Sequence, residues 1–425
     1  MGWTARAVTS SPVETTPALP SLPGREGWGV ATTWLALLCL VLTGMRFDLS
    51  FGLTAGLALT VVLLPLWVPW VRSSRWITWM VVLGVASATG SVWLTLWHSD
   101  TRGVSTAGLL ESVFGVLGLV CGIVCVLWAR SRSSIGVVGA VFGIGLLLGI
   151  NPAGGTFAEN PWRFGFSLPV TVIVLAIVTR WRRRWLDVIA VLALAGVSAL
   201  NGGRSTSAIL LLVALLVVWQ SWGRPASSKL AAIRTLILFG MLAFGTYLSV
   251  QAAILEGALG ESAQLRTELQ LSTSGTLITG GRPEIGATLA LMAESPGGFG
   301  GGAVPNMTDV LVAKSGMSAI GYDPNNGYVE NYMFGSGFEV HSVIGDLWAW
   351  CGIPGLALAV VLLVFLVTRT AVLTTGRAAS ALLLFLGVKS IWNLLFAPLE
   401  SALTVLVLAV ALMAPLALQK RRTDE

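Results

Sequence analysis

Three short motifs carry the side chains best suited to chemistry in this sequence. They are NGGRSTS around Arg204, GGRPE around Arg282 and EVHS around His341. An arginine makes planar, two-pronged contacts with phosphate, and the N–H groups at a helix start also attract anions. A histidine titrates near neutrality and can take or give a proton. The three residues therefore predict recognition of a phosphate-bearing group, combined with proton transfer.

Each motif also has a purely structural interpretation. Arg204 suits a capped turn at a membrane surface, because the two preceding glycines permit a tight turn. Glu284 is placed to neutralise Arg282 in a local ion pair. A single histidine at an interface is often only solvated or hydrogen-bonded, and His98, close to Asp100, is assigned such a role. These alternatives stay open at the level of the sequence.

Motifs for nucleotides and metals are missing from the chain. It contains no P-loop and no dinucleotide fingerprint. Its four cysteines lie inside apolar stretches, with no histidine or carboxylate at a ligand spacing. We therefore expect neither a cofactor nor a metal, and the free energy for a reaction would come from the substrate itself.

The composition indicates a protein that is solvated mostly by lipid. Of 425 residues, 55% are hydrophobic and 11% charged, with a mean hydropathy of +0.82. A soluble domain carries about 25% charged residues, so a soluble enzyme, a disordered chain and a disulfide scaffold are excluded. The 18 tryptophans suit anchoring at the membrane interface.

Twelve apolar runs have about the length that a helix needs to cross a bilayer. They lie at 28–45, 51–70, 76–97, 107–128, 134–150, 164–179, 185–200, 207–222, 232–252, 346–367, 379–397 and 399–418. We expect an all-α polytopic membrane protein with about twelve transmembrane helices and one large outer loop between spans nine and ten. The expected parts are a disordered cytoplasmic N-terminus (1–27), spans one to nine (28–252), the outer loop (253–345), spans ten to twelve (346–418) and a cytoplasmic tail (419–425).

The basic residues predict the orientation of these spans. With the N-terminus in the cytoplasm, 18 lysines and arginines fall on the inner side and seven on the outer side. This distribution satisfies the positive-inside rule and places both termini in the cytoplasm. The outer loop is rich in glycine and holds nine acidic and three basic residues, and a connection of this length is usually functional. Inside the membrane, Lys389 and Glu400 are expected to pair across consecutive spans.

The order of the motifs resembles one family of glycan transferases. A turn around Arg204 precedes one span, and Arg282 opens the long loop, which continues to the glycine-rich run ESPGGFG at 294–300. His341 and the run GIPGL at 352–356 follow. An earlier outer run, GTFAENP, precedes Arg163. In order and topology the chain resembles the O-antigen ligase and O-antigen polymerase superfamily, best over residues 150 to 365.

The resemblance implies a metal-independent enzyme of the cytoplasmic membrane. It would transfer a glycan from a polyprenyl-pyrophosphate carrier, at the outer face, onto a hydroxyl of a glycan, lipid or protein acceptor, with no role for nucleic acid. Arg204 and Arg282 would hold the pyrophosphate, with Arg163 nearby, and His341 would orient or deprotonate the attacking hydroxyl. Two positions depart from the family pattern: Ser342 stands where asparagine is frequent, and Trp350-Cys351 replaces an acidic residue.

Two other classes of protein remain as alternatives. A secondary transporter or flippase of lipid-linked oligosaccharides also has about twelve spans, but it usually shows two similar halves and ionisable residues at the membrane midplane. The single long loop and the few charges within spans favour the enzyme. A metal-dependent polyprenyl-phosphate sugar transferase would need acidic residues in the first outer loop, where only Asp48 is present.

Overall fold

The computed structural model describes residues 24–222, 228–255, 264–265, 267–268, 271, 282–335 and 337–415. Within these ranges the chain is almost entirely helical, which agrees with an all-α membrane protein. The expected boundaries at residues 1–23 and 419–425 lie outside the described residues, and the first helix begins at Gly24, before the apolar run.

The elements follow one another along the chain with short connections, apart from the segment between α11 and α16. They are α1 (Gly24–Met45), β1 (Asp48–Ser50), β2 (Leu53–Thr54), α2 (Ala55–Val62), α3 (Leu64–Trp67), the 3-10 helix η1 (Val68–Ser73), α4 (Arg75–Trp97), α5 (Thr106–Arg130), α6 (Ile135–Leu148), α7 (Gly155–Glu159), the π-helix η2 (Trp162–Phe166), α8 (Ser167–Val178), the 3-10 helix η3 (Thr179–Trp181), α9 (Arg184–Leu200), α10 (Arg204–Ser221), α11 (Lys229–Leu255), α14 (Glu284–Glu294), α15 (Met307–Ala319), the π-helix η4 (Val329–Met333), α16 (Val343–Thr375), α17 (Ala381–Phe396) and α18 (Leu399–Met413).

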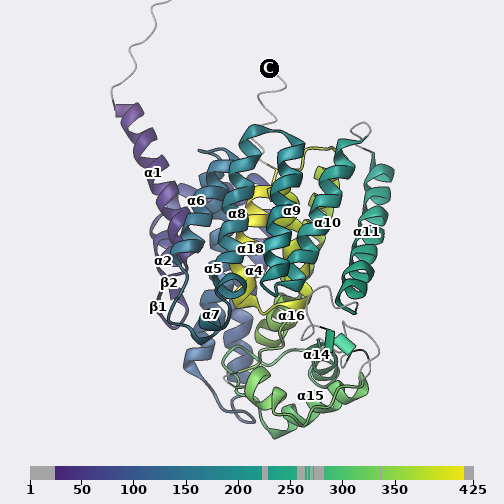
Figure 1. The fold of residues 1–425 in the computed structure, drawn as a ribbon. Helices are drawn as coiled ribbons and strands as arrows, with labels where there is room; N and C mark the ends of the chain where they lie inside the picture. The colour runs from purple at the N-terminus through teal and green to yellow at the C-terminus, as the bar shows by residue number, and fades with distance from the viewer. Residues whose placement is uncertain are drawn as a thin grey trace, which may run out of the picture.

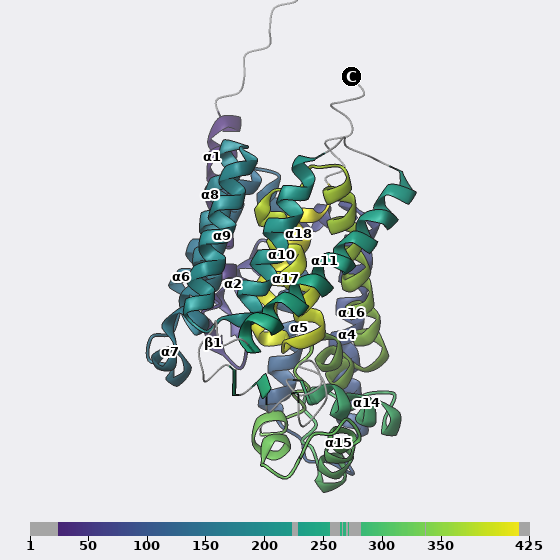
Figure 2. The same cartoon turned by 45° about the vertical axis from the view of Figure 1, so that its right-hand side comes forward.

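The long helices run side by side as one bundle, and α14 and α15 lie beyond one end of it (Figure 1). α1 begins and α18 ends at the opposite end (Figure 1). Figure 2 again places α14 and α15 beyond the ends of α4 and α16. The described residues from 282 onward in the segment that the sequence assigns to the outer loop therefore form a folded cap at one end of the bundle. We call residues 282–342 the cap.

Six helices in the described part of the chain are long and apolar enough to cross a membrane. They are Arg75–Trp97, Thr106–Arg130, Trp162–Trp181, Arg204–Ser221, Leu230–Ser249 and Val343–Thr375. The run expected as a span at 51–70 is broken, and its halves Ala55–Val62 and Leu64–Ser73 meet at 71°. Pro65, in the first turn of the second half, lacks an N–H group, which explains the break. Shorter apolar helices are Gly29–Met45, Ile135–Leu148, Ala381–Phe396 and Leu399–Met413.

Two basic side chains at the end of the bundle opposite the cap bind the carboxyl end of α18. Arg130 donates hydrogen bonds to the carbonyls of Ala411 (2.9 Å) and Ala414 (2.6 Å). Arg369 donates to the carbonyl of Met413 at 2.9 Å. The last carbonyls of a helix have no partner within it, so these arginines satisfy groups that lipid would leave unpaired.

α16 is interrupted where the cap reaches it. Gly352 has φ 65° and ψ −144° inside this helix, and a Cβ there would lie 2.4 Å from the carbonyl oxygen of Gly297. The break frees the carbonyl of Ala349, which accepts hydrogen bonds from the N–H groups of Phe299 (2.8 Å) and Gly300 (3.0 Å). Glycine is required at this position by both its conformation and its space.

The same glycine-rich run also docks on α4 and α5. The N–H of Gly301 donates to Ser91 at 3.1 Å, and the N–H of Gly302 donates to Thr95 at 3.0 Å. The N–H of Ser105 donates to the carbonyl of Gly302 at 2.8 Å. The run 294–300 and the residues after it thus fix the cap to the bundle through backbone groups, which side chains at these glycines would block.

Candidate functional site

Arg282 and His341 lie on the walls of one cavity with a volume of about 370 Å³. The cavity is bounded by the start of α14, the residues just before α16 and the end of α17. Arg282 precedes the first turn of α14, and His341 precedes α16. Two motifs that are far apart in the sequence are therefore neighbours in the fold.

The rest of the cavity wall is mostly apolar. α14 contributes Ile285 and Leu289, and the end of α17 contributes Leu394, Leu395 and Phe396. Apolar walls around a few convergent polar groups are typical of a site for an organic ligand. A ligand with both an anionic group and a hydrocarbon part matches this surface.

The backbone holds His341 in an uncommon conformation. Its φ is 56°, in the left-handed region, and the residue is only 6% exposed. Its Nδ1 lies 3.0 Å from the carbonyl oxygen of Glu339, so Nδ1 carries the proton and donates. In the neutral form of the ring, Nε2 is then the nitrogen without a proton, which is the one that a general base uses. The imidazole ring also stacks on Tyr332, with 4.3 Å between ring centres.

Asp346, which the sequence analysis did not single out, positions this backbone. It is fully buried in the first turn of α16. Oδ1 accepts the N–H of Val340 at 3.0 Å, and Oδ2 accepts the N–H of Leu399 at 2.8 Å. The segment before His341 is thereby tied to the start of α18. An acidic residue in the first turn of an apolar helix is a signal in the sequence that could have drawn attention to Asp346. Its two hydrogen-bond partners, in contrast, are known only from the structure.

Glu284 does not pair with Arg282, contrary to the alternative considered above. Among the described residues, no ion pair joins the two. Instead Oε1 of Glu284 accepts a hydrogen bond from the hydroxyl of Tyr328 at 2.5 Å. Burial, followed by the Glu284 charge, raises the pKa of the Tyr328 hydroxyl, which therefore stays protonated and donates. Arg282 keeps its charge available to the cavity.

Arg204 and Arg163 are not among the described residues that line the cavity. Arg204 starts α10 and donates to the hydroxyl of Thr267 at 3.3 Å. The guanidinium of Arg163 lies 4.8 Å from the centre of the Phe164 ring. Its charge nevertheless acts on Tyr332: burial and then the Glu284 charge raise the pKa of this hydroxyl, and the charges of Arg282 and Arg163 act in the opposite direction. Arg163 thus contributes to the electrostatic field at the residue that stacks on the histidine.

The turns that carry Arg204 and Arg163 contact each other directly. The side-chain amide of Asn160 donates to the carbonyl of Asn201 at 2.8 Å, and its oxygen accepts the N–H of Arg163 at 2.9 Å. Asn160 therefore joins the turn before Arg204 to the backbone of Arg163. Gly280 and Gly281, which belong to the Arg282 motif, lie outside the described residues.

The expected pair of Lys389 and Glu400 is wrong. Glu400 instead lies beside Arg46, with 3.8 Å between Nη2 and Oε1, and Arg46 also donates to the backbone carbonyl of Glu400 at 2.5 Å. Lys389 precedes the end of α17 by two turns, about 10 Å along the axis, whereas Glu400 is in the first turn of α18. The two therefore differ in depth. Lys389 lies within electrostatic range of Arg282.

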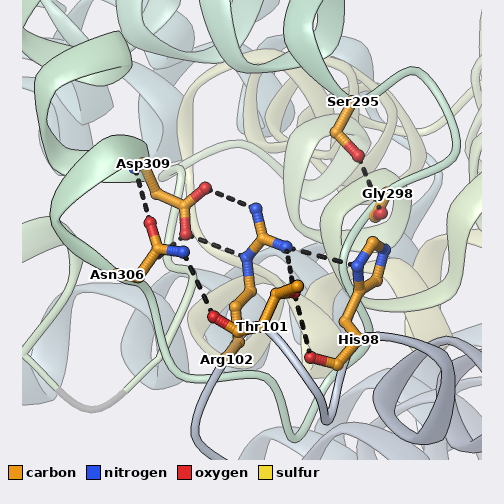
Figure 3. Close-up of polar contacts among 7 residues, drawn as sticks. All are labelled: His98, Thr101, Arg102, Ser295, Gly298, Asn306 and Asp309. Carbon is orange, nitrogen blue, oxygen red and sulfur yellow. Dashed lines mark hydrogen bonds and ion pairs between the residues drawn. The ribbon is translucent and has the colours of Figure 1, made fainter.

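A second polar cluster attaches α15 to the α4–α5 connection (Figure 3). Arg102 donates to both carboxylate oxygens of Asp309, at 2.9 Å and 2.7 Å. His98 lies 3.2 Å from Arg102 through Nδ1, and Asn306 caps α15 together with Asp309. Burial and then the Arg102 charge lower the pKa of His98, so its neutral ring accepts this hydrogen bond. His98 thus has the structural role that the sequence suggested.

The guanidinium of Arg102 also lies over the ring of Phe299, 4.9 Å from its centre. Phe299 in turn stacks on Phe338 at 4.0 Å. These contacts make the cluster an anchor of the cap. None of its residues lines the cavity.

Within the part of the chain that the structure describes, no group of three or more His, Cys, Asp or Glu side chains is arranged to hold a metal ion. Comparisons with protein-family models, curated proteins and solved structures give no match for this chain. The arguments for its function therefore rest on the residues and the geometry of the cavity.

Proposed function

We propose that this protein is a membrane-embedded glycan transferase that uses a polyprenyl-pyrophosphate-linked donor. The observation that carries the proposal is the shared cavity of Arg282 and His341, with a cation and a base on apolar walls. The cation matches a diphosphate, the apolar walls match the polyprenyl chain, and the base matches an acceptor hydroxyl. The family resemblance implies the same donor and the same reaction.

In the proposed reaction, an acceptor oxygen attacks the anomeric carbon of the donor sugar. The new carbon–oxygen bond forms as the bond between that carbon and the diphosphate breaks, and polyprenyl diphosphate leaves with the electron pair. His341 takes the proton of the acceptor hydroxyl through Nε2. Charge grows on the diphosphate as the bond breaks, so Arg282 stabilises the transition state more than the ground state.

Other cations extend the proposed diphosphate site. Lys389 lies within electrostatic range of Arg282 and adds a second positive charge from the membrane side. Arg163, whose charge reaches Tyr332, adds positive potential to the site at longer range. Arg204 is proposed as a further donor-binding residue, supported by the contact of its turn with the Arg163 turn.

We further propose twelve membrane crossings, both termini in the cytoplasm, and location in the cytoplasmic membrane with the cap outside. The 18-to-7 distribution of basic residues supports this orientation. Labelling tests it: Asn325→Cys, in an exposed turn of the cap, should react with an impermeant maleimide in intact cells. Ser133→Cys, in the α5–α6 connection, should react only after lysis. The reverse pattern would contradict the orientation.

The activity is tested in source cells that lack the protein. We expect these cells to accumulate a polyprenyl-linked glycan, which wild-type protein removes and Arg282→Ala or His341→Ala does not. Lys314→Ala is the matched control, because this cation pairs with Glu330 on the cap surface and does not line the cavity. Accumulation of single repeats would indicate a polymerase, and accumulation of finished chains a ligase.

A second assay separates transferase from transporter. Purified protein in vesicles without any acceptor should not move the lipid-linked glycan between leaflets. Movement without an acceptor, together with full function of both cavity variants, would overturn the proposal in favour of a flippase.

A further inference from the structure

We propose that Glu284 binds sugar hydroxyl groups of the lipid-linked donor, beside the diphosphate that Arg282 holds. This inference rests on the proposed function and adds a hydroxyl-binding position to the cavity.

The carboxylate of Glu284 has one satisfied and one unsatisfied oxygen. The residue is 5% exposed and lines the cavity. Oε1 accepts the Tyr328 hydroxyl, whereas Oε2 is buried without a hydrogen-bond partner among the described residues. A buried acceptor without a partner is unfavourable, so such a group in a cavity wall indicates a place for a donor that comes from a ligand.

Aromatic contacts hold this carboxylate in a fixed relation to the proposed base. Tyr328, which donates to Glu284, packs against Tyr332 with 4.9 Å between ring centres. Tyr332 stacks on His341 at 4.3 Å. The two tyrosines therefore support Glu284 and His341 on the walls of the same cavity. A donor sugar whose hydroxyl is bound by Glu284 would therefore be held in a fixed position relative to the acceptor hydroxyl that His341 deprotonates.

The chemistry of the carboxylate selects the ligand group. An ionised carboxylate only accepts hydrogen bonds, so its partner must be an O–H or N–H donor. A phosphate oxygen would be repelled by Glu284 and attracted by Arg282, two residues earlier. A free cation would be repelled by Arg282 and Lys389. A ligand that joins a diphosphate to neighbouring hydroxyl groups satisfies both sides, and a glycosyl diphosphate has this pattern.

The experiment compares two probes on purified protein in nanodiscs. Undecaprenyl diphosphate carries the charge and the chain but no sugar, and undecaprenyl-diphosphate N-acetylglucosamine adds the hydroxyl groups. We measure binding of each by competition with a fluorescent short-chain diphosphate. The variants are Glu284→Ala, Glu284→Gln and Arg282→Ala, with Glu330→Gln as a carboxylate control on the cap surface.

For wild type we expect the glycosylated lipid to bind about 10- to 100-fold more tightly than the same-length diphosphate without sugar, the range of one hydrogen bond to a charged group. Glu284→Ala should lose this preference and bind undecaprenyl diphosphate at least as well as wild type, which also shows that the cavity is folded. Glu284→Gln should keep part of the preference through its one oxygen. Arg282→Ala should weaken both probes, and Glu330→Gln neither.

Two results would overturn the inference. Glu284 variants that keep the full preference for the glycosylated lipid show that its hydroxyl groups bind elsewhere, while the proposed transferase function stands. If the wild-type protein binds neither probe, the cavity is not a diphosphate site, and both the proposed function and the role of Glu284 are contradicted.

Discussion

The buried carboxylate of Asp346, at the start of α16, accepts the backbone N–H of Leu399, at the start of α18, at 2.8 Å. The same side chain accepts the N–H of Val340 at 3.0 Å, directly before the candidate catalytic histidine. One buried acid therefore joins the loop of the site to two helices of the bundle. This arrangement explains how a residue at φ 56° is kept in place, because the strain at His341 is offset by contacts on both sides.

Asp346→Asn should loosen this junction. Asparagine has one acceptor oxygen, so an N–H donor would face the side-chain amide, at a loss of about 1–3 kcal/mol. We expect a lower unfolding temperature in detergent and a larger loss of glycan transfer than the change in stability explains, because His341 is displaced. An unchanged unfolding temperature and activity would show that Asp346 has no positioning role. Glu330→Gln, at an exposed pair, serves as the control.

Breaking the ion pair of Arg102 and Asp309 should release the cap from the bundle. The two side chains are 13% and 3% exposed and are joined by two hydrogen bonds, so removal of one partner leaves a buried charge, at about 3–5 kcal/mol. Asp309→Asn should make the cap sensitive to protease while the helices of the bundle stay protected. Lys314→Gln, which breaks the more exposed pair with Glu330, should leave the cleavage pattern unchanged. Equal protection of both variants would contradict the anchoring role of Arg102.

Gly352→Ala should disrupt the junction of α16 with the glycine-rich run. The new Cβ would lie 2.4 Å from the carbonyl of Gly297, and the residue has φ 65°. We expect a loss of more than about 2 kcal/mol, because both strain and overlap act at this residue. Gly118→Ala in α5 is a matched control, since nothing lies within 4 Å of the added Cβ. Thermal unfolding of both variants in detergent checks this, and similar temperatures would contradict it.

The half-buried Glu339 predicts a dependence of stability on pH. Burial raises its pKa, the Glu400 and Glu111 charges act in the same direction, and the His341 charge lowers it. The folded state then holds a proton that the unfolded state loses near pH 4.3, an approximate reference value. Stability should therefore fall as the pH rises from about 4.3 through the raised folded pKa. Glu339→Gln should remove this fall, as measured by unfolding temperatures at several pH values. Parallel curves for the two proteins would exclude Glu339 as the source.

The helices and two of the residues that line the cavity could be singled out from the sequence alone. Hydropathy is a local property, and each of the twelve apolar runs contains a helix or a broken helix. Arg282 and His341 were also identified from the sequence, because their types and their place next to helix starts are visible in the motifs. Glu284 was noted there as well, but with the wrong partner.

Only the tertiary structure decided which of these residues meet. Lys389 and Glu400 are near in sequence yet differ in depth, and Glu400 meets Arg46 across the bundle instead. Glu284 accepts a hydrogen bond from Tyr328, and Asp346 accepts hydrogen bonds from N–H groups before α16 and at the start of α18. These pairings depend on helix ends, on the break of α16 at Gly352 and on the docking of the cap, all of which join residues far apart in the chain. The sequence therefore determined the helices and the chemistry of the side chains, whereas long-range packing determined the cavity and the partners of its buried charges.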